Sequence, residues 1–123
     1  KGISKTIPTL VNRWFTDSFI KKSPGIIKQR LQQVIDIDPN TFLNVFRIYA
    51  NTEMKSWLHK ITLPTLVLTG ENDKGCNPRL NQFIANQLIN SKLIILPHFK
   101  HSILIEAPNL VSKNLINFFT KDH

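Results

Sequence analysis

Two short polar loops of this 123-residue chain carry the residue types of an acid–base pair. The first loop holds Glu71 and Asp73, and the second holds His98 and His101. A carboxylate that accepts the Nδ1 proton of a histidine fixes its tautomer and stabilises the imidazolium, which leaves Nε2 to deprotonate a nucleophile. The residue types therefore indicate nucleophilic catalysis if the fold brings one acid and one histidine together.

Each loop follows a short apolar segment with the character of a buried strand. Residues 65–69 end at Gly70, and residues 92–96 end at Pro97. Runs without polar alternation are typical of parallel sheets, whose strands are covered on both faces. A strand, a helix and a second strand of this length form a right-handed βαβ crossover, so both loops should leave the same carboxyl edge of the sheet. Open α/β sheets bind their ligands at this edge.

Helix start signals precede apolar residues at helical spacing in the first half of the chain. Ser23-Pro24 and Asp38-Pro39 each place a capping residue before a proline and predict two helix starts. Residues 10–20 predict one earlier helix. Three short amphipathic helices have few partners of their own, so this half should lie against another part of the protein.

The second half alternates strands with helices. Pro78 begins the helix between the two strands, and Pro108 begins the last helix. We therefore expect residues 1–60 to form a helical cap or lid segment and residues 61–123 to form the core segment that carries the acid and histidine loops. The inner face of the last helix is predicted to hold Leu110, Val111, Leu115, Phe118 and Phe119.

The balance of charges raises the question of nucleic-acid binding, because 16 Lys and Arg against 8 Asp and Glu give a net charge of +8. The basic residues are scattered from Lys1 to Lys121, and no nucleic-acid-binding motif accompanies them. We expect no nucleic-acid partner. The longest aliphatic run, residues 93–96, is far shorter than the roughly 20 apolar residues of a membrane helix, so we expect no membrane partner.

Cys76 is the single cysteine. It can form no internal disulfide and no structural zinc site of four protein ligands. A reducing compartment is the expectation, which predicts a cytoplasmic protein. In sequence Cys76 has no adjacent basic partner, so we interpret it as a small buried hydrophobic residue rather than a nucleophile.

The two loops and their flanking elements resemble the last third of an α/β-hydrolase. In that family a strand ending in Gly-x-x-Asp supplies the acid of the triad, and a later strand leads to His-x-x-x-x-Glu-x-Pro. Gly70 and Asp73 match the acid loop, and His101, Glu106 and Pro108 match the histidine loop, in the family's order of acid before histidine. The resemblance implies an α/β chain that is the C-terminal portion of an α/β-hydrolase fold, a parallel strand–helix–strand–helix unit preceded by a helical cap segment.

The helical half is similar to the cap of 3-oxoadipate enol-lactonase and its relatives, through residues 12–16 and 57–64. This resemblance implies a serine-type hydrolase of a small-molecule carboxylic ester or enol-lactone. A serine would attack the carbonyl, His101 would move the proton, and Asp73 would orient His101. This chemistry requires no metal or organic cofactor.

The family's nucleophile elbow, Gly-x-Ser-x-Gly, does not occur in this sequence. The oxyanion hole also comes from that part of the fold. We expect a fragment that is inactive alone, with the missing N-terminal half of the hydrolase, or a second chain, completing the sheet. Alternatives are dehalogenase, C–C hydrolase or haloperoxidase chemistry on the same scaffold, and a non-catalytic binding or interaction fragment.

Several neighbours of the pair have other interpretations. Glu71 is interpreted as a solvated loop charge, and His98 comes too early for the motif. Glu106 is expected to support the histidine loop or to cap the final helix. Relatives often carry glycine just before the histidine, where this chain has Lys100, so the backbone conformation there is open.

Aromatic residues at helical spacing in the first half predict core packing first and the lining of an apolar substrate pocket second. The pocket candidates are Trp14, Phe15 and Phe19, and Phe42 and Phe46 share the pattern.

Overall fold

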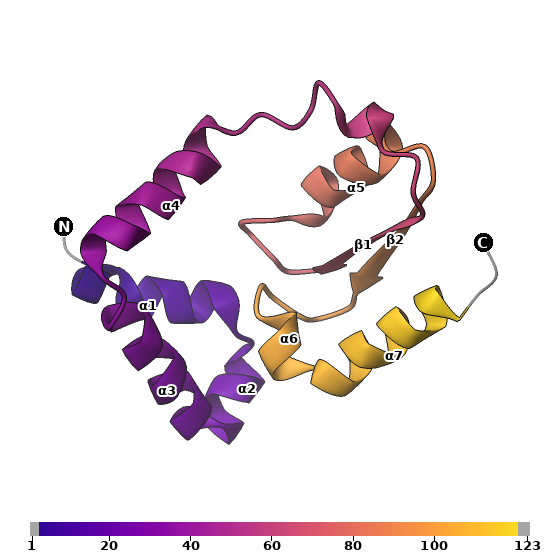
Figure 1. Cartoon of the computed structure of the whole chain (residues 1–123). Helices are drawn as coiled ribbons and strands as arrows, with labels where there is room; N and C mark the ends of the chain where they lie inside the picture. The colour runs from indigo at the N-terminus through magenta and orange to yellow at the C-terminus, as the bar shows by residue number, and fades with distance from the viewer. Residues whose placement is uncertain (1–2, 121–123) are drawn as a thin grey trace.

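A computed structural model describes the backbone from Ile3 to Thr120 and the side chains from Pro8 to Thr120. This part of the chain forms a series of short helices and one parallel pair of strands (Figure 1). In chain order the elements are α1 (Ile3–Trp14), α2 (Asp17–Lys22), α3 (Pro24–Ile35), α4 (Pro39–Asn51), the 3-10 helix η1 (Leu58–Lys60), β1 (Thr65–Gly70), α5 (Pro78–Gln87), β2 (Ser91–Leu96), α6 (Ile103–Glu106) and α7 (Pro108–Phe119).

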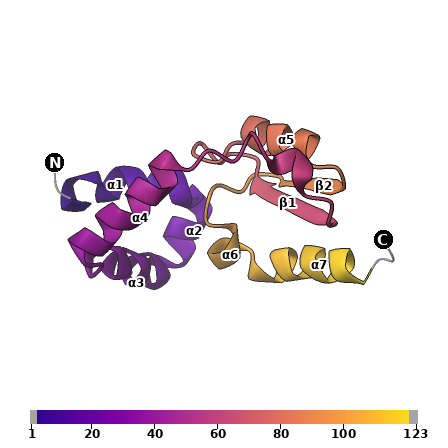
Figure 2. The same cartoon turned by 45° about the horizontal axis from the view of Figure 1, so that its top comes forward.

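The first four helices gather at one end of the molecule, and the strands with α5 and α7 form the other end (Figures 1 and 2). The predicted starts of α3 and α4 are confirmed, because Pro24 and Pro39 are their first residues. Asp38 caps α4 by accepting the Thr41 N–H at 2.8 Å. α1 and α2 both pack against α3. The division of the chain into a cap and a core at residues 60 and 61 stays a prediction.

The prediction of one helix over residues 10–20 is wrong, because the chain breaks into α1 and α2. The side chain of Thr16 caps α2 by accepting the Phe19 N–H at 3.3 Å. The Thr16 N–H itself donates to Glu106, a residue 90 positions away. Phe15 is fully buried at this corner and stacks on Phe19, with 5.6 Å between ring centroids. The break thus depends on a distant acceptor that helical spacing does not reveal.

The predicted βαβ unit is confirmed. β1 pairs in parallel with β2, in a register that runs from Thr65 opposite Ser91 to Gly70 opposite Leu96. The sheet lies between α5 on one face and α7 on the other (Figures 1 and 2). The core that joins η1, β1 and α5 consists of Leu58, Val67, Ala85 and Leu88, with Ile61 and Leu93 packed against it.

Several helices present apolar side chains that the rest of the described chain does not cover. α7 buries Val111 and Phe118, but Phe119 is 76% exposed, so its predicted place on the inner face is wrong. α4 buries none of its residues, and its aromatic Phe46 and Tyr49 are 54% and 74% exposed. Among the described residues the sheet has only two strands. No helix in the described range has the length and apolar character needed to cross a membrane.

Gly70, the last residue of β1, lies where the two loops at the carboxyl edge come closest. A Cβ atom placed on Gly70 would lie 2.3 Å from the carbonyl oxygen of Lys100 and 2.6 Å from that of Phe99. These distances are far inside van der Waals contact and involve backbone atoms, which cannot rotate away. Glycine is therefore required here by close backbone approach.

Replacing Gly70 with alanine should push the two loops apart and lower the free energy of unfolding by roughly 1–3 kcal/mol. Urea denaturation measures this loss. Gly25→Ala is the matched control, because a Cβ atom at Gly25 meets nothing within 4 Å. An equal response of the two variants would contradict the steric account of Gly70.

Candidate active site

The structure brings Asp73 and His101 together at the carboxyl edge of the sheet. The Nδ1 atom of His101 lies 2.7 Å from Oδ2 of Asp73. Asp73 is 6% exposed, whereas the His101 side chain is 46% exposed. An ionised carboxylate can only accept a hydrogen bond, so Nδ1 carries the proton and the second ring nitrogen is left with a free lone pair. Such a nitrogen can accept a proton from a nucleophile.

The carboxylate of Asp73 is held from its other side by its own loop. Its Oδ1 atom accepts the backbone N–H of Gly75 at 2.8 Å and that of Cys76 at 2.9 Å. Burial raises the pKa of Asp73, but the hydrogen bond from His101, the two backbone donors and the charge of His101 together lower it by more. The net pKa lies below the ordinary aspartate value, so the group is ionised near neutral pH.

Backbone hydrogen bonds join the acid loop to the histidine loop. The Asn72 N–H donates to the carbonyl of Phe99 at 2.8 Å. Glu71, interpreted from sequence as a solvated charge, accepts the backbone N–H of His98 at 2.8 Å. It thus supports the loop and does not contact His101. His98 has a φ of 67° and is the sole non-glycine residue between Ile3 and Thr120 with a positive φ, a conformation in which histidine is enriched.

Lys100 occupies the position where relatives often carry glycine, and its backbone is not left-handed. Its ammonium group donates to the carbonyl of Asn12 at 2.9 Å and forms an ion pair with Asp17 at 3.2 Å. The Ser102 N–H donates to the carbonyl of Trp14 at 2.8 Å, which satisfies a free acceptor at the end of α1. The histidine loop is therefore tied to the corner between α1 and α2.

Glu106 completes this tie. Its carboxylate accepts the backbone N–H of Thr16, at 3.1 Å to Oε2, and also the Thr16 hydroxyl. The expectation that Glu106 supports the histidine loop fits this contact, although its partner lies in the helical half rather than in α7.

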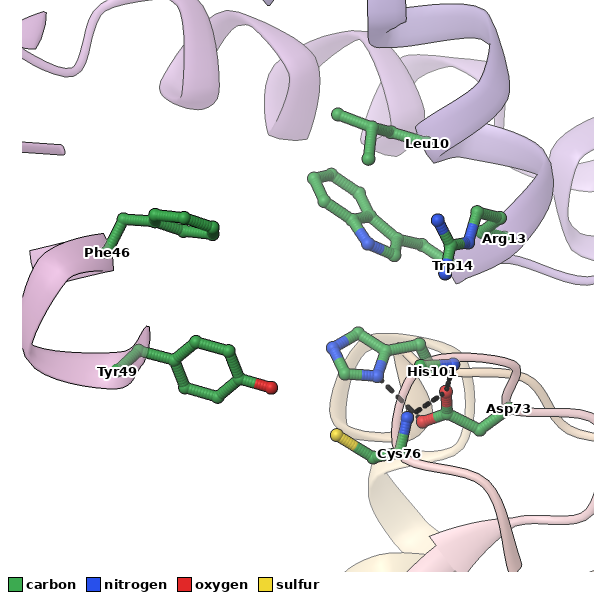
Figure 3. Close-up of a pocket in the computed structure, with 9 residues that line it drawn as sticks. Leu10, Arg13, Trp14, Phe46, Tyr49, Asp73, Cys76 and His101 are labelled. Carbon is green, nitrogen blue, oxygen red and sulfur yellow. Dashed lines mark hydrogen bonds and ion pairs between the residues drawn. The ribbon is translucent and has the colours of Figure 1, made fainter. Parts of the chain in front are cut away.

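A cavity of about 470 Å³ opens above the Asp73–His101 pair (Figure 3). Figure 3 shows the free edge of the imidazole turned into this cavity, toward the side where Phe46 and Tyr49 lie. Helices α1 and α4 and the two loops supply its walls. The lining residues are Leu10, Arg13, Trp14, Phe46, Tyr49, Asp73, Gly75, Cys76 and His101.

Of the three aromatic residues predicted for the pocket, only Trp14 lies here. Phe15 is buried in the core, and Phe19 lines a separate hollow of about 300 Å³ beside His98. Arg30 lies over the Trp14 ring at 5.9 Å from its centroid, a cation–π contact that holds the ring in place. Tyr49, which we did not predict as a pocket residue, lines the cavity because it follows Phe46 by three positions on the same face of α4.

Cys76 is exposed on the cavity wall, so its interpretation as a buried residue is wrong. Its backbone position explains this exposure. The Cys76 carbonyl accepts the hydroxyl of Thr69 at 2.9 Å and the side-chain amide of Asn81 at 2.7 Å, while its sulfur stands beside His101 (Figure 3). Partial desolvation and the negative charge of Asp73 raise the pKa of the Cys76 thiol. The sulfur is therefore protonated near neutral pH and is a poor nucleophile.

Comparison with known proteins finds similarity to several hydrolases. No protein-family model matches the chain. The chain is 25% identical over 108 residues to 3-oxoadipate enol-lactonase 2 of Acinetobacter baylyi. This match covers 88% of this chain and 40% of that protein. The chain is also 34% identical over 64 residues to a proline iminopeptidase of Pestalotiopsis fici. This match covers 52% of this chain and 23% of that protein.

The solved structure of the enol-lactonase from Burkholderia xenovorans superposes with a TM-score of 0.91 at 18% identity, over 98% of this chain and 46% of the other. The chain thus has the fold of the C-terminal part of an α/β-hydrolase, and it is similar to enol-lactonases in particular. It spans less than half the length of the relatives that it matches.

The tie between Glu106 and Thr16 should contribute measurably to stability. Glu106→Ala would leave the partly buried Thr16 N–H without its acceptor and should lower the free energy of unfolding by about 1–3 kcal/mol. Glu106→Gln keeps one acceptor oxygen and should lose less. Equal losses for the two variants in urea denaturation would show that the acceptor is unimportant.

The lowered pKa of Asp73 predicts a specific loss of stability in acid. The native state binds this proton more weakly than the unfolded state, so the stabilisation is complete above about pH 4 and disappears as the pH falls through the lowered native pKa. The wild-type chain should therefore lose more stability than Asp73→Asn between about pH 5 and pH 3.

Urea denaturation across this range measures the difference. Asp38 also has a lowered pKa, because the backbone and side chain of Thr41 donate hydrogen bonds to it. Asp38 is present in both proteins, so the comparison cancels its effect. Parallel acid profiles for the two proteins would contradict the assignment to Asp73.

Proposed function

We propose that Asp73 and His101 are the acid and the base of a serine-type hydrolase that acts on a carboxylic ester or an enol-lactone. The observation that carries the proposal is the 2.7 Å contact between the two side chains beneath an open cavity. Their order in the chain is that of the α/β-hydrolase triad, and each follows a strand of the matching type.

In the proposed reaction His101 accepts the proton of a serine hydroxyl as the oxygen attacks the substrate carbonyl. It returns that proton to the leaving group when the tetrahedral intermediate collapses. Asp73 holds the imidazole in the tautomer with its proton on Nδ1, and its charge stabilises the imidazolium that forms in between. The lowered pKa of Asp73 suits this role, because the carboxylate remains ionised throughout.

The serine and the oxyanion hole would come from the part of the fold that this chain does not span. In α/β-hydrolases the nucleophile lies on the turn after an earlier strand, N-terminal to the acid and the histidine. We infer that the free face of the imidazole in Figure 3 is where that serine would lie.

The size and lining of the cavity support the proposal of a small acyl substrate. Its volume of about 470 Å³ falls in the range of about 300–1,000 Å³ that is usual for ligand pockets. Its walls combine the aromatic Trp14, Phe46 and Tyr49 with the guanidinium of Arg13. The named enol-lactonases among the relatives favour an ester or lactone over the dehalogenase, C–C hydrolase and haloperoxidase alternatives.

The test joins this chain to an N-terminal α/β-hydrolase segment. One route adds any coding sequence found upstream of residue 1, and a second adds the N-terminal part of the Burkholderia xenovorans enol-lactonase. Hydrolysis of short aryl esters and of an enol-lactone is then measured. We expect turnover that falls by about 10⁴-fold in His101→Ala, because loss of a triad member removes the proton transfer.

The matched control is His98→Asn, which removes the neighbouring histidine and retains a residue type that tolerates a positive φ. Its activity should stay close to that of the parent. Undiminished hydrolysis in His101→Ala would remove His101 from the mechanism. A completed protein that is folded and hydrolyses none of these substrates would refute the proposed substrate class.

A further inference from the structure

Three side chains of metal-binding type meet at the floor of the cavity. One ligand atom each from Asp73, Cys76 and His101 lies within 4.8 Å of the others. Figure 3 shows the sulfur of Cys76 next to the imidazole, with the Asp73 carboxylate close by. The proposed hydrolysis uses only two of these groups. The thiol, which is exposed and has no role in that reaction, needs a separate explanation.

The donor set has the chemistry of a zinc site with an open position. Zn²⁺ binds thiolate, imidazole and carboxylate ligands in a tetrahedral arrangement, with bonds of about 2.0–2.3 Å. Ligand atoms around such an ion lie about 3–4 Å apart, so small rotations of these three side chains would bring them into position. Sites with three protein ligands keep the fourth position for water, and here that position would face the open cavity.

The surroundings of the three side chains would support an ion. Oδ1 of Asp73 is already held by two backbone N–H groups, so Oδ2 is the atom left to coordinate. The Cys76 carbonyl is held by Thr69 and Asn81, which fixes the backbone that carries the sulfur. Hydrogen bonds to ligating groups from such neighbours orient the ligands and raise affinity.

We propose that Asp73, Cys76 and His101 form a binding site for a thiophilic divalent cation of the Zn²⁺ class, and that the bound ion inhibits the hydrolase reversibly. On binding, the thiol releases its proton to solvent and a metal–sulfur bond forms. The ion also binds one ring nitrogen of His101. Binding at Nε2 uses the free lone pair directly, whereas binding at Nδ1 moves the proton of that nitrogen to Nε2 and breaks the hydrogen bond to Asp73. In both cases the imidazole keeps no lone pair that could accept a proton. The binding claim stands on the cluster alone, whereas the inhibition claim rests on the proposed function of His101.

Binding is tested on the chain itself, first by calorimetric titration with Zn²⁺ in a buffer that does not coordinate metals. We expect one ion per chain, with affinity lower by about tenfold or more in Cys76→Ser. Titration with Co²⁺ should give the near-ultraviolet charge-transfer absorbance of a cobalt–thiolate bond, and Cys76→Ser should lack it. Circular dichroism verifies that the variant keeps its fold, as expected where the backbone of Cys76 makes the supporting hydrogen bonds.

The matched control is His98→Asn, which removes a nearby histidine outside the cluster and should bind the ions as the parent does. Equal Zn²⁺ affinity in the parent and Cys76→Ser, or a cobalt complex without thiolate absorbance, would overturn the site.

Inhibition is tested on the completed hydrolase. Zn²⁺ should inhibit the parent, a chelator should restore its activity, and Cys76→Ser should need about tenfold or more Zn²⁺ for the same fractional inhibition. Zinc binding in a protein whose hydrolysis is independent of His101 would refute the proposed function and leave the metal site standing. Hydrolysis that depends on His101, in a protein that binds no zinc, would refute the metal site and leave the proposed function standing.

Discussion

The close approach of two backbone segments at Gly70 is the constraint on which the candidate site depends. The parallel register places Gly70 opposite Leu96, so the chain leaves both strands at the same level. The absence of a side chain at Gly70 lets the carbonyls of Phe99 and Lys100 pass against β1. Asn72 then donates to Phe99, and Asp73 reaches His101. A distance of 2.7 Å between side chains from different loops is possible because their backbones are in contact.

The histidine loop also connects the two ends of the molecule. On one side it bonds to the acid loop, and on the other side Lys100 and Ser102 bond to the end of α1. The carboxylate of Glu106 accepts the backbone N–H of Thr16, the residue at the break between α1 and α2. Helix α1 thereby carries Trp14 to the cavity wall, where it faces the side chains of α4. The position of the cavity thus follows from the same loop that holds His101.

The charge of Asp73 has two effects at this site. It accepts the hydrogen bond from Nδ1 of His101, and it disfavours the thiolate of Cys76. The protonated thiol is a weak nucleophile and would not compete with a catalytic serine for the substrate. This property is compatible with the proposed hydrolase. A divalent cation would reverse this balance, because its positive charge stabilises the thiolate and the carboxylate together.

The sequence by itself determined the two strands, the helices that begin at prolines and the presence of an acid and a histidine after successive strands. These features depend on short-range rules of dihedral angle, capping and hydrophobic period, which act within a few residues. The family motif then singled out Asp73 and His101 from their neighbours Glu71 and His98. Only the tertiary structure decided that the chain breaks at Thr16, that Phe15 is buried while Tyr49 faces the cavity, and that the sulfur of Cys76 is exposed beside His101. The break at Thr16 and the place of Cys76 beside His101 depend on partners far away in the chain, because loop closure and strand register bring together residues whose local patterns are independent of one another.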